Sequence, residues 1–325
     1  MPFWDQWDGE GLKLYRPWLD NSLTWHAVLA PHNEHRMALT RLADLALVAV
    51  IGRWDTWWQL LLNAGLHAMT AALVVGAVWP AFTAAARPLF AVAIGVLFAL
   101  PTDWQNALWG FQSAFYFAPL LAVIAAAGMA NARLGSVRWW LGGGAAALAL
   151  FSHAGGILVA AAVFGSLALA LVLHAPAAKI WPTLVFTACV LLAGIWLHAP
   201  QAQHTIARAQ TIAQFLGAFT RCLAWPYVDR GSWALLLQLP LLVLIFADWR
   251  AQRKPDAAMQ FAMALGLFAV LQAAAVAYSR AGTLPELRPL SRYYNPFFLG
   301  VAAQIFALCK LAERYGRAAR LGLLG

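Results

Sequence analysis

The sequence predicts an all-α membrane protein, a polytopic transmembrane helical bundle of about nine spans preceded by a juxtamembrane helical segment. Of its 325 residues, 62% are hydrophobic and 11% are charged, whereas soluble domains average about 45–50% and about 25%. The mean hydropathy is +0.67. The apolar runs are rich in Ala, Leu and Val and do not alternate, which favours helices over a membrane β-barrel. A soluble enzyme, a disordered chain and a disulfide-rich domain are excluded.

Nine apolar runs follow a polar N-terminal segment, and each is expected to cross the membrane. A span needs about 20 apolar residues, and several of the runs are shorter, so their boundaries are approximate. Their predicted boundaries are 57–79, 87–101, 110–130, 138–152, 156–174, 181–199, 233–248, 258–279 and 293–312. The chain therefore divides into an outer-face acidic loop with a juxtamembrane helix (1–56), a transmembrane bundle (57–312) and a basic cytoplasmic tail (313–325).

The segment 37–51 contains Arg41 and Asp44. At about 15 residues it is short for a span, so an interfacial helix is expected. The alternative is that this segment crosses the membrane and places the acidic head in the cytoplasm.

Basic residues indicate the topology. There are 22 Lys and Arg against 13 Asp and Glu, a net charge of +9, and the basic residues are scattered between apolar runs rather than gathered into a nucleic-acid patch. The short loops that carry them alternate along the chain, which places those loops in the cytoplasm by the positive-inside rule. The opposite side then holds the head and the connections 102–109, 152–155, 200–232 and 280–292.

Tryptophans at the ends of the runs predict an aromatic belt at the membrane interfaces. They are Trp57, Trp58, Trp79, Trp104, Trp109, Trp139, Trp140, Trp181 and Trp233.

The head begins with WDQWDGE, residues 4–10, which contains Asp5, Asp8 and Glu10. Three carboxylates between aromatic residues are able to act as a base or to coordinate a metal ion. The alternative is a solvated acidic turn with tryptophan anchors, because acidic clusters are common in loops.

A second polar cluster is PHNEHR, residues 31–36, with His32, Glu34, His35 and Arg36. Its spacing differs from the HExxH of zinc proteases, and no further ligand lies at a usual distance. Arg36 as a donor and Glu34 as an acceptor suit a phosphate or a sugar hydroxyl. The alternative is a local salt-bridge network.

Two short connections are unusually polar for membrane depth. The segment 101–112 carries Asp103, Gln105, Asn106 and Gln112, and FSHAGG at 151–156 carries His153. Polar groups in lipid are costly and often functional. The alternatives are loop polarity with a helix cap from Asp103 and a structural histidine.

The segment 280–294 places Arg280, Arg288, Arg292 and Tyr293 on a non-cytoplasmic loop. Three arginines there oppose the positive-inside trend. They predict an anionic partner, for which a lipid phosphate is the natural source at this depth. The alternative is pairing with the acidic head.

Five polar clusters thus converge on one side, without a nucleophile elbow, Walker loop or dinucleotide fingerprint. Carboxylates and arginines suit the attack of an acceptor on a glycosyl phosphate, in which one carboxylate takes the acceptor's proton and cations hold the departing phosphate.

The head also resembles the first outer loop of the GT-C glycosyltransferases, multi-span enzymes that use polyprenyl-phosphate sugars. The matching pieces are the acidic motif, PHNEHRMALTRL from Pro31, a helix to Ile51, and Gly52 before the run from Trp57. The strings HNEHR, WQNALWGFQSAFYF and SRYY also resemble a group of uncharacterised bacterial multi-span proteins. The span that the family places before the acidic motif is absent here, so we expect it upstream or missing.

The resemblance implies a catalytic carboxylate at Asp5 or Asp8, with Glu10 as an alternative or as a partner for a divalent cation. It implies outer-loop arginines on the donor phosphate, a polyprenyl-phosphate sugar donor, a glycan, lipid or protein acceptor, and the bacterial cytoplasmic membrane as location. The alternatives are a transporter or flippase of a lipid-linked or anionic solute, and a non-catalytic accessory subunit. Transporters usually have internal repeats, and none is evident.

Overall fold

The computed structural model describes residue 2 and residues 5–198 and 202–322, with side chains left out at 202–204 and 316–322. This part of the chain is helical and contains no strand, apart from an isolated β-bridge between His32 and His35. The head comprises η1 (Trp7–Tyr15), α1 (Arg16–Leu19), α2 (Trp25–Leu29) and α3 (Ala38–Ile51). The bundle comprises α4 (Thr56–Val78), α5 (Ala86–Ala99), α6 (Trp104–Ala107), α7 (Ser113–Met129), α8 (Val137–Ala149), α9 (Ile157–Val172), α10 (Ala177–Trp196), α11 (Ile212–Leu223), α12 (Ala234–Arg250), α13 (Ala257–Arg280) and α14 (Asn295–Gly322).

Eight helices among the described residues are long and apolar enough to cross a membrane. They correspond to eight of the nine predicted runs, so the all-α polytopic bundle is confirmed. The remaining run, 138–152, forms α8. Its 13 residues span only about 20 Å at 1.5 Å per residue. A hydrocarbon core is about 30 Å thick, so α8 is too short to cross it alone.

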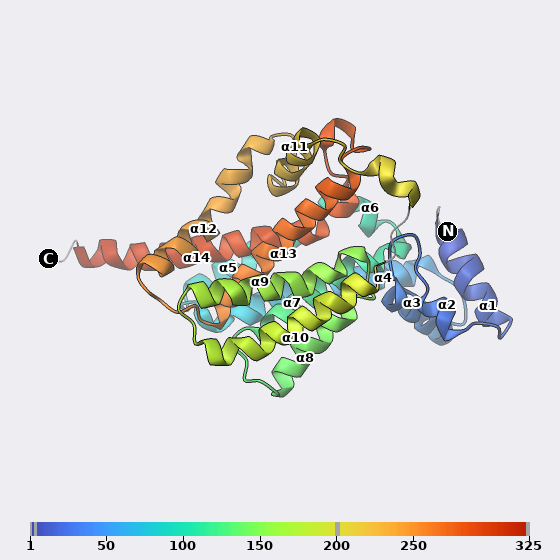
Figure 1. Cartoon of the computed structure of the whole chain (residues 1–325), viewed down its shortest axis with the longest axis horizontal. Helices are drawn as coiled ribbons and strands as arrows, with labels where there is room; N and C mark the ends of the chain where they lie inside the picture. Colours follow the sequence, from blue (N-terminus) through green and yellow to red (C-terminus); the bar gives the residue numbers. More distant parts are fainter. Residues whose placement is uncertain (1, 3–4, 199–201, 323–325) are drawn as a thin grey trace.

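The most buried spans are α7, α13 and α14, and the other long helices surround them. Figure 1 shows the head helices α1–α3 at one end of the bundle, while the C-terminal helix α14 extends from the opposite end. The head rests on the bundle through backbone contacts such as the Leu39 N–H, which donates to the Phe151 carbonyl over 3.2 Å. Polar segments far apart in sequence therefore meet at the head end.

Glycine allows α7 and α8 to pack with their backbones in contact. A Cβ on Gly128 would lie 2.5 Å from the Cα of Gly142, and a Cβ on Gly142 would lie 2.9 Å from the Cα of Gly128. Close approach at small residues is the usual way in which helices associate in lipid. The pair thus fixes α8 against the central helix α7, and α8 leads directly into the 151–156 connection.

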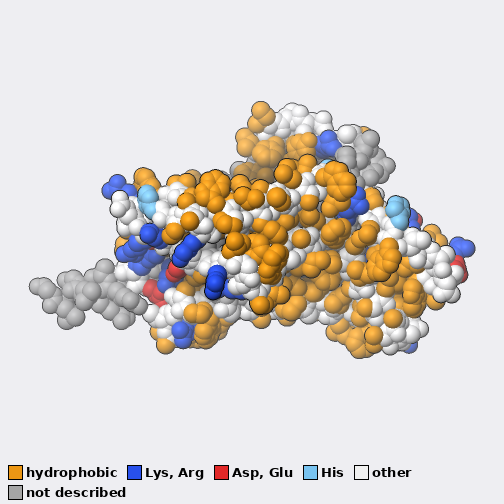
Figure 2. All heavy atoms as spheres, turned by 60° about the horizontal axis from the view of Figure 1, so that its bottom comes forward, with side chains coloured by type: hydrophobic (Ala, Val, Ile, Leu, Met, Phe, Trp, Pro, Cys, Tyr) orange, Lys and Arg blue, Asp and Glu red, His pale blue; other side chains and the backbone are white. Residues whose placement is uncertain are grey.

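The end opposite the head collects basic side chains, as the positive-inside pattern predicts for one side of the membrane (Figure 2). Arg314 on α14 pairs with Asp248 on α12, with 2.7 Å between Nη1 and Oδ1. Lys310 pairs with Glu313, which accepts from the Thr83 backbone N–H after α4. A broad hydrophobic surface lies between this end and the head in Figure 2. Which end faces the cytoplasm stays a prediction.

Seven of the nine belt tryptophans are exposed, as an interfacial belt requires. The other two, Trp109 and Trp139, are buried inside the protein. Trp139 donates its indole N–H to the Thr183 hydroxyl over 2.9 Å, so it joins α8 to α10 rather than anchoring the interface.

Candidate functional site

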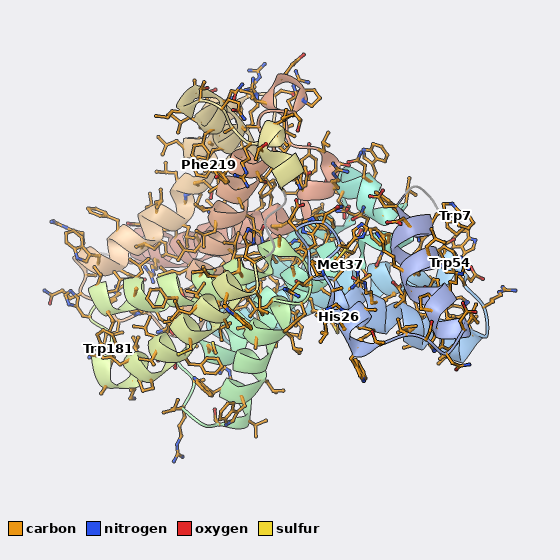
Figure 3. All side chains as sticks on the ribbon, turned by 45° about the vertical axis from the view of Figure 1, so that its right-hand side comes forward. Trp7, His26, Met37, Trp54, Trp181 and Phe219 are labelled. Carbon is orange, nitrogen blue, oxygen red and sulfur yellow. The ribbon has the colours of Figure 1, made fainter. Side chains whose placement is uncertain are left out.

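A cavity of about 590 Å³ lies where the head meets the bundle. Its walls come from the head loop 32–37, the start of α7, the 153–158 segment, and the α13 end with the following 279–283. Met37 contributes to this wall, and Figure 3 places it between the head and the long helices. Ligand pockets usually measure about 300–1,000 Å³, so this cavity is large enough for a sugar phosphate.

The cavity gathers most of the residues that the sequence singled out. Nine predicted site residues line it, from segments that lie far apart in the chain. They are Asp5, His32, Glu34, His35, Gln112, His153, Arg280, Arg292 and Tyr293. The expected convergence of the head, the 101–112 segment, the 151–156 connection and the 280–294 loop therefore holds for at least one residue of each.

Glu34 links the head to the end of α13. Arg280 donates to its carboxylate, and the guanidinium also hydrogen-bonds the Tyr293 hydroxyl. The His35 Nε2 lies 3.7 Å from Glu34 Oε1. Arg280 is thus compensated by a carboxylate of the head, which was the alternative interpretation of the 280–294 arginines.

Two other cavity arginines, Arg208 and Arg292, form no ion pair with a carboxylate of the described residues. Arg292 lies over the Tyr293 ring at 5.2 Å, and Arg208 lies over the Tyr278 ring at 5.8 Å. Cation–π contact leaves the charge of a guanidinium uncompensated. The two arginines therefore give the cavity an anion-binding character.

Arg292 is held in place through its main chain. Its N–H donates to Gln105 Oε1 over 3.2 Å, and its carbonyl accepts from Asn106 Nδ2 over 2.9 Å. Arg208 is placed similarly, because the next residue, Ala209, donates its N–H to the Tyr278 carbonyl over 2.9 Å. Gln105 and Asn106 do not line the cavity but position a residue that does.

The three head carboxylates lie in three different environments. Asp5 is exposed, lines the cavity, and forms no ion pair with a described residue. Asp8 is exposed and pairs with Lys13 over 2.5 Å. Glu10 is buried. The described residues contain no group of three or more His, Cys, Asp or Glu that could hold a metal ion, so the acidic head is not one compact ligand set.

Glu10 belongs to a buried carboxyl pair that joins the head to α4. The Gln59 side-chain amide donates to Glu10 Oε2 over 2.9 Å and to Asp44 Oδ1 over 2.8 Å. Gln6 donates to the same Glu10 oxygen over 3.3 Å. Burial raises the pKa of Glu10 to about 7 and that of Asp44 well above its usual value. The nearby Glu10 carboxyl also raises the pKa of Asp44, because two negative charges in one buried site repel each other.

This pair predicts that the head docks less tightly as the pH rises. An acid with a raised native pKa stabilises the docked state while it is protonated, so the stabilisation is complete below about pH 4.5 and is lost as the pH rises to about 7. Between these values the loss approaches about 1.4 kcal/mol per pH unit for one proton. We expect a lower melting temperature at pH 8 than at pH 5, measured in detergent by intrinsic fluorescence. The Glu10→Gln variant should lose most of this difference, whereas Asp8→Asn should retain it. Equal pH dependence in all three proteins would show that the buried Glu10 carboxyl is not its source.

Three further predicted residues lie outside the cavity. Arg36 donates to the Leu197 and Leu29 carbonyls, Asp103 is buried and accepts from the Tyr116 hydroxyl over 3.0 Å, and Arg288 is half-exposed and pairs with Asp229 and Glu286. Their contacts anchor loops and helix ends.

Burial keeps the cavity histidines neutral near pH 7. It lowers the pKa of His35 to about 3 and that of His153 to about 4, and it also lowers the pKa of His32. The Ala154 N–H donates to His35 Nδ1 over 3.1 Å, so the ring proton of His35 is on Nε2. These imidazoles therefore act as hydrogen-bonding groups rather than as cations.

Sequence reasoning did not single out Arg208, Gln272 or Tyr278 for the cavity, nor Asp44 for the carboxyl pair. Arg208 lies in the 200–232 connection on the expected outer side, and its charge against the positive-inside trend was the available signal. Gln272 is a buried amide within an apolar span, which is itself a functional signal in membranes.

Comparison with protein-family models, with curated proteins and with solved structures finds no match to this chain. Its eight long apolar helices identify an integral, multi-pass membrane protein, and the chemistry of the cavity is the guide to its function.

Proposed function

We propose that the protein is a glycosyltransferase that moves a sugar from a polyprenyl-phosphate donor to a glycan, lipid or protein of the cell envelope. The observation that carries the proposal is the composition of the cavity, which combines the Asp5 carboxylate with the guanidinium groups of Arg208 and Arg292. Neither guanidinium has a carboxylate partner among the described residues, so both are available to a ligand.

The arginines provide the binding site for the donor phosphate. A guanidinium presents a planar fork of N–H donors that matches phosphate oxygens, and charge-assisted hydrogen bonds of this kind are stronger than neutral ones. Their charge also stabilises the negative charge that develops on the phosphate as the glycosidic bond breaks.

Asp5 serves as the general base. Its carboxylate takes the proton of the acceptor hydroxyl, whose oxygen forms a bond to the anomeric carbon of the sugar. The bond between that carbon and the phosphate oxygen breaks, and polyprenyl phosphate leaves with the bonding electron pair. Attack from the face opposite the phosphate inverts the anomeric configuration.

The position of the cavity supports a transferase over a transporter. It is lined by the first turns of α7 and α9 and the last turns of α13, at the head end of the bundle. Transporter sites lie near the bilayer midplane, where both sides gain access in turn. A lipid-linked donor at the interface would present its phosphate at this end, with its polyprenyl chain in the membrane and the acceptor outside it, in the bacterial cytoplasmic membrane.

Arg292→Gln is the direct test of the phosphate site. We expect kcat/KM for the donor to fall about 10- to 100-fold, as the loss of a charge-assisted hydrogen bond predicts. The measurement is transfer of a radiolabelled sugar from its polyprenyl phosphate to a membrane extract by the purified protein in liposomes.

Arg288→Gln is the matched control. Arg288 lies, like Arg292, in the connection between α13 and α14, but it pairs with Asp229 and Glu286 and does not line the cavity. It should retain at least half of the wild-type value. Equal losses in the two variants would contradict the assignment of Arg292, and no transfer from any polyprenyl-phosphate sugar would contradict the proposed function.

A further inference from the structure

The cavity has a second wall whose chemistry differs from that of Arg208 and Arg292. His32 and His153 both line it. His153 is only 6% exposed, and its Nδ1 is buried without a hydrogen-bond partner among the described residues. The His32 Nε2 is in the same situation. Leaving such an atom without a hydrogen bond is energetically unfavourable, and a bound ligand that hydrogen-bonds it would remove that cost.

The hydrogen-bonding state of these rings limits what they bind. Neutral imidazole has one donor and one acceptor nitrogen, which matches a hydroxyl group. A carboxylate accepts only, and it would also meet the Glu34 carboxylate beside His35. The histidine wall therefore favours an uncharged, hydroxyl-rich group over an anionic one.

Local packing holds the His153 ring at the cavity surface. Phe115 packs edge to face on it, with ring centres 5.2 Å apart, and also lines the cavity. A Cβ on Gly155 would lie 2.6 Å from His153 Cε1 and 2.7 Å from Gln272 Oε1, so only glycine lets these groups approach. Gln272 donates to the Gly155 carbonyl over 2.9 Å. The Phe115 ring also offers an apolar surface to the C–H face of a sugar.

We propose that His32 and His153 form a subsite for the hydroxyl groups of an uncharged sugar, while Arg208 and Arg292 take the phosphate attached to it. The inference rests on the proposed function and deepens it by naming the class of sugar: a neutral hexose or pentose, not a uronic acid. The two arginines select the phosphate of the ligand, and the two histidines select the sugar that is attached to it.

Equilibrium binding, without turnover, tests this subsite. The probes are geranyl phosphate, glucosyl geranyl phosphate and the glucuronosyl analogue, each titrated calorimetrically into the purified protein in nanodiscs without acceptor. The wild-type protein should bind the glucosyl probe about tenfold more tightly than either other probe, which corresponds to about 1.4 kcal/mol. His153→Ala should abolish this preference while its affinity for geranyl phosphate stays within twofold.

The control is His26→Ala, because His26 is exposed on α2 and does not line the cavity; it should keep the preference. His153→Gln, which retains hydrogen-bonding groups, should restore part of it. Three results would overturn the subsite: equal binding of the glucosyl and glucuronosyl probes by the wild-type protein, an unchanged preference in His153→Ala, or a parallel loss of geranyl phosphate binding, which would mark the ring as structural.

The same data separate this inference from the proposed function. A wild-type protein that prefers the glucosyl probe but transfers no sugar would refute the transferase and keep the subsite. A protein that transfers sugars but does not distinguish neutral from acidic ones would refute the subsite alone.

Discussion

The Asp5→Asn variant is expected to lose sugar transfer by about 10²- to 10⁴-fold in kcat, the usual contribution of a general base. The amide has the same shape as the carboxylate but cannot accept the proton of the acceptor hydroxyl. Because Asp5 forms no ion pair with a described residue and is exposed on the cavity wall, the folded structure should not change. The measurement is the initial rate of transfer at saturating donor, with the melting temperature as a check on folding.

Asp8→Asn is the control within the same acidic motif. Asp8 is exposed and pairs with Lys13 rather than lining the cavity, and exposed pairs contribute little to stability. Its transfer rate should stay within twofold of the wild type. Full activity in Asp5→Asn, or an equal loss in both variants, would show that the base lies elsewhere.

The Gly128→Val substitution should have the largest effect on folding. The added Cβ would lie 2.5 Å from the Gly142 Cα and 2.8 Å from the Arg138 carbonyl oxygen, and both are backbone atoms that no rotamer change can move. Overpacking costs about 1–3 kcal/mol where side chains can adjust, so at least about 3 kcal/mol is expected. The readout is the yield of monodisperse protein in detergent and its melting temperature.

Gly144→Val is the control for the loss of a glycine at this pair of helices, because Gly144 lies on α8, the helix that Gly128 of α7 contacts through Gly142. Apart from its own helix backbone, no atom lies within 4 Å of a Cβ at Gly144, so the protein should keep its yield and melting temperature. Similar melting temperatures for the Gly128 and Gly144 variants would mean that α7 and α8 are not packed backbone to backbone.

Hydropathy predicted most of the fold because eight of the nine apolar runs coincide with helices that are long and apolar enough to cross a membrane. It could not predict that the run 138–152 forms the short α8, because apolar composition does not reveal where a helix ends. It also could not place Trp139, since an indole at the end of a run anchors equally well to lipid or, as here, to Thr183 on a neighbouring helix.

The candidate site was predicted where charge opposed its surroundings, as with Arg280 and Arg292 on a loop expected outside. The roles within a cluster were not predictable. Asp8 and Glu10 lie two residues apart in one helix and so face different directions, which sends one to solvent and the other to Asp44. The Arg292 backbone N–H donates to the Gln105 side-chain oxygen far away in the sequence, and no local pattern encodes this bond.

The cavity draws its walls from both ends of the chain, because Asp5 and His32 precede the first long apolar helix while Arg292 directly precedes the last, α14. During synthesis, the head and most of the bundle therefore emerge from the ribosome before the guanidinium of Arg292 exists. A nascent chain cannot bind a phosphate with both arginines until α14 enters the membrane. Under the proposed function, synthesis of the segment just before α14 is therefore the step that completes the phosphate site.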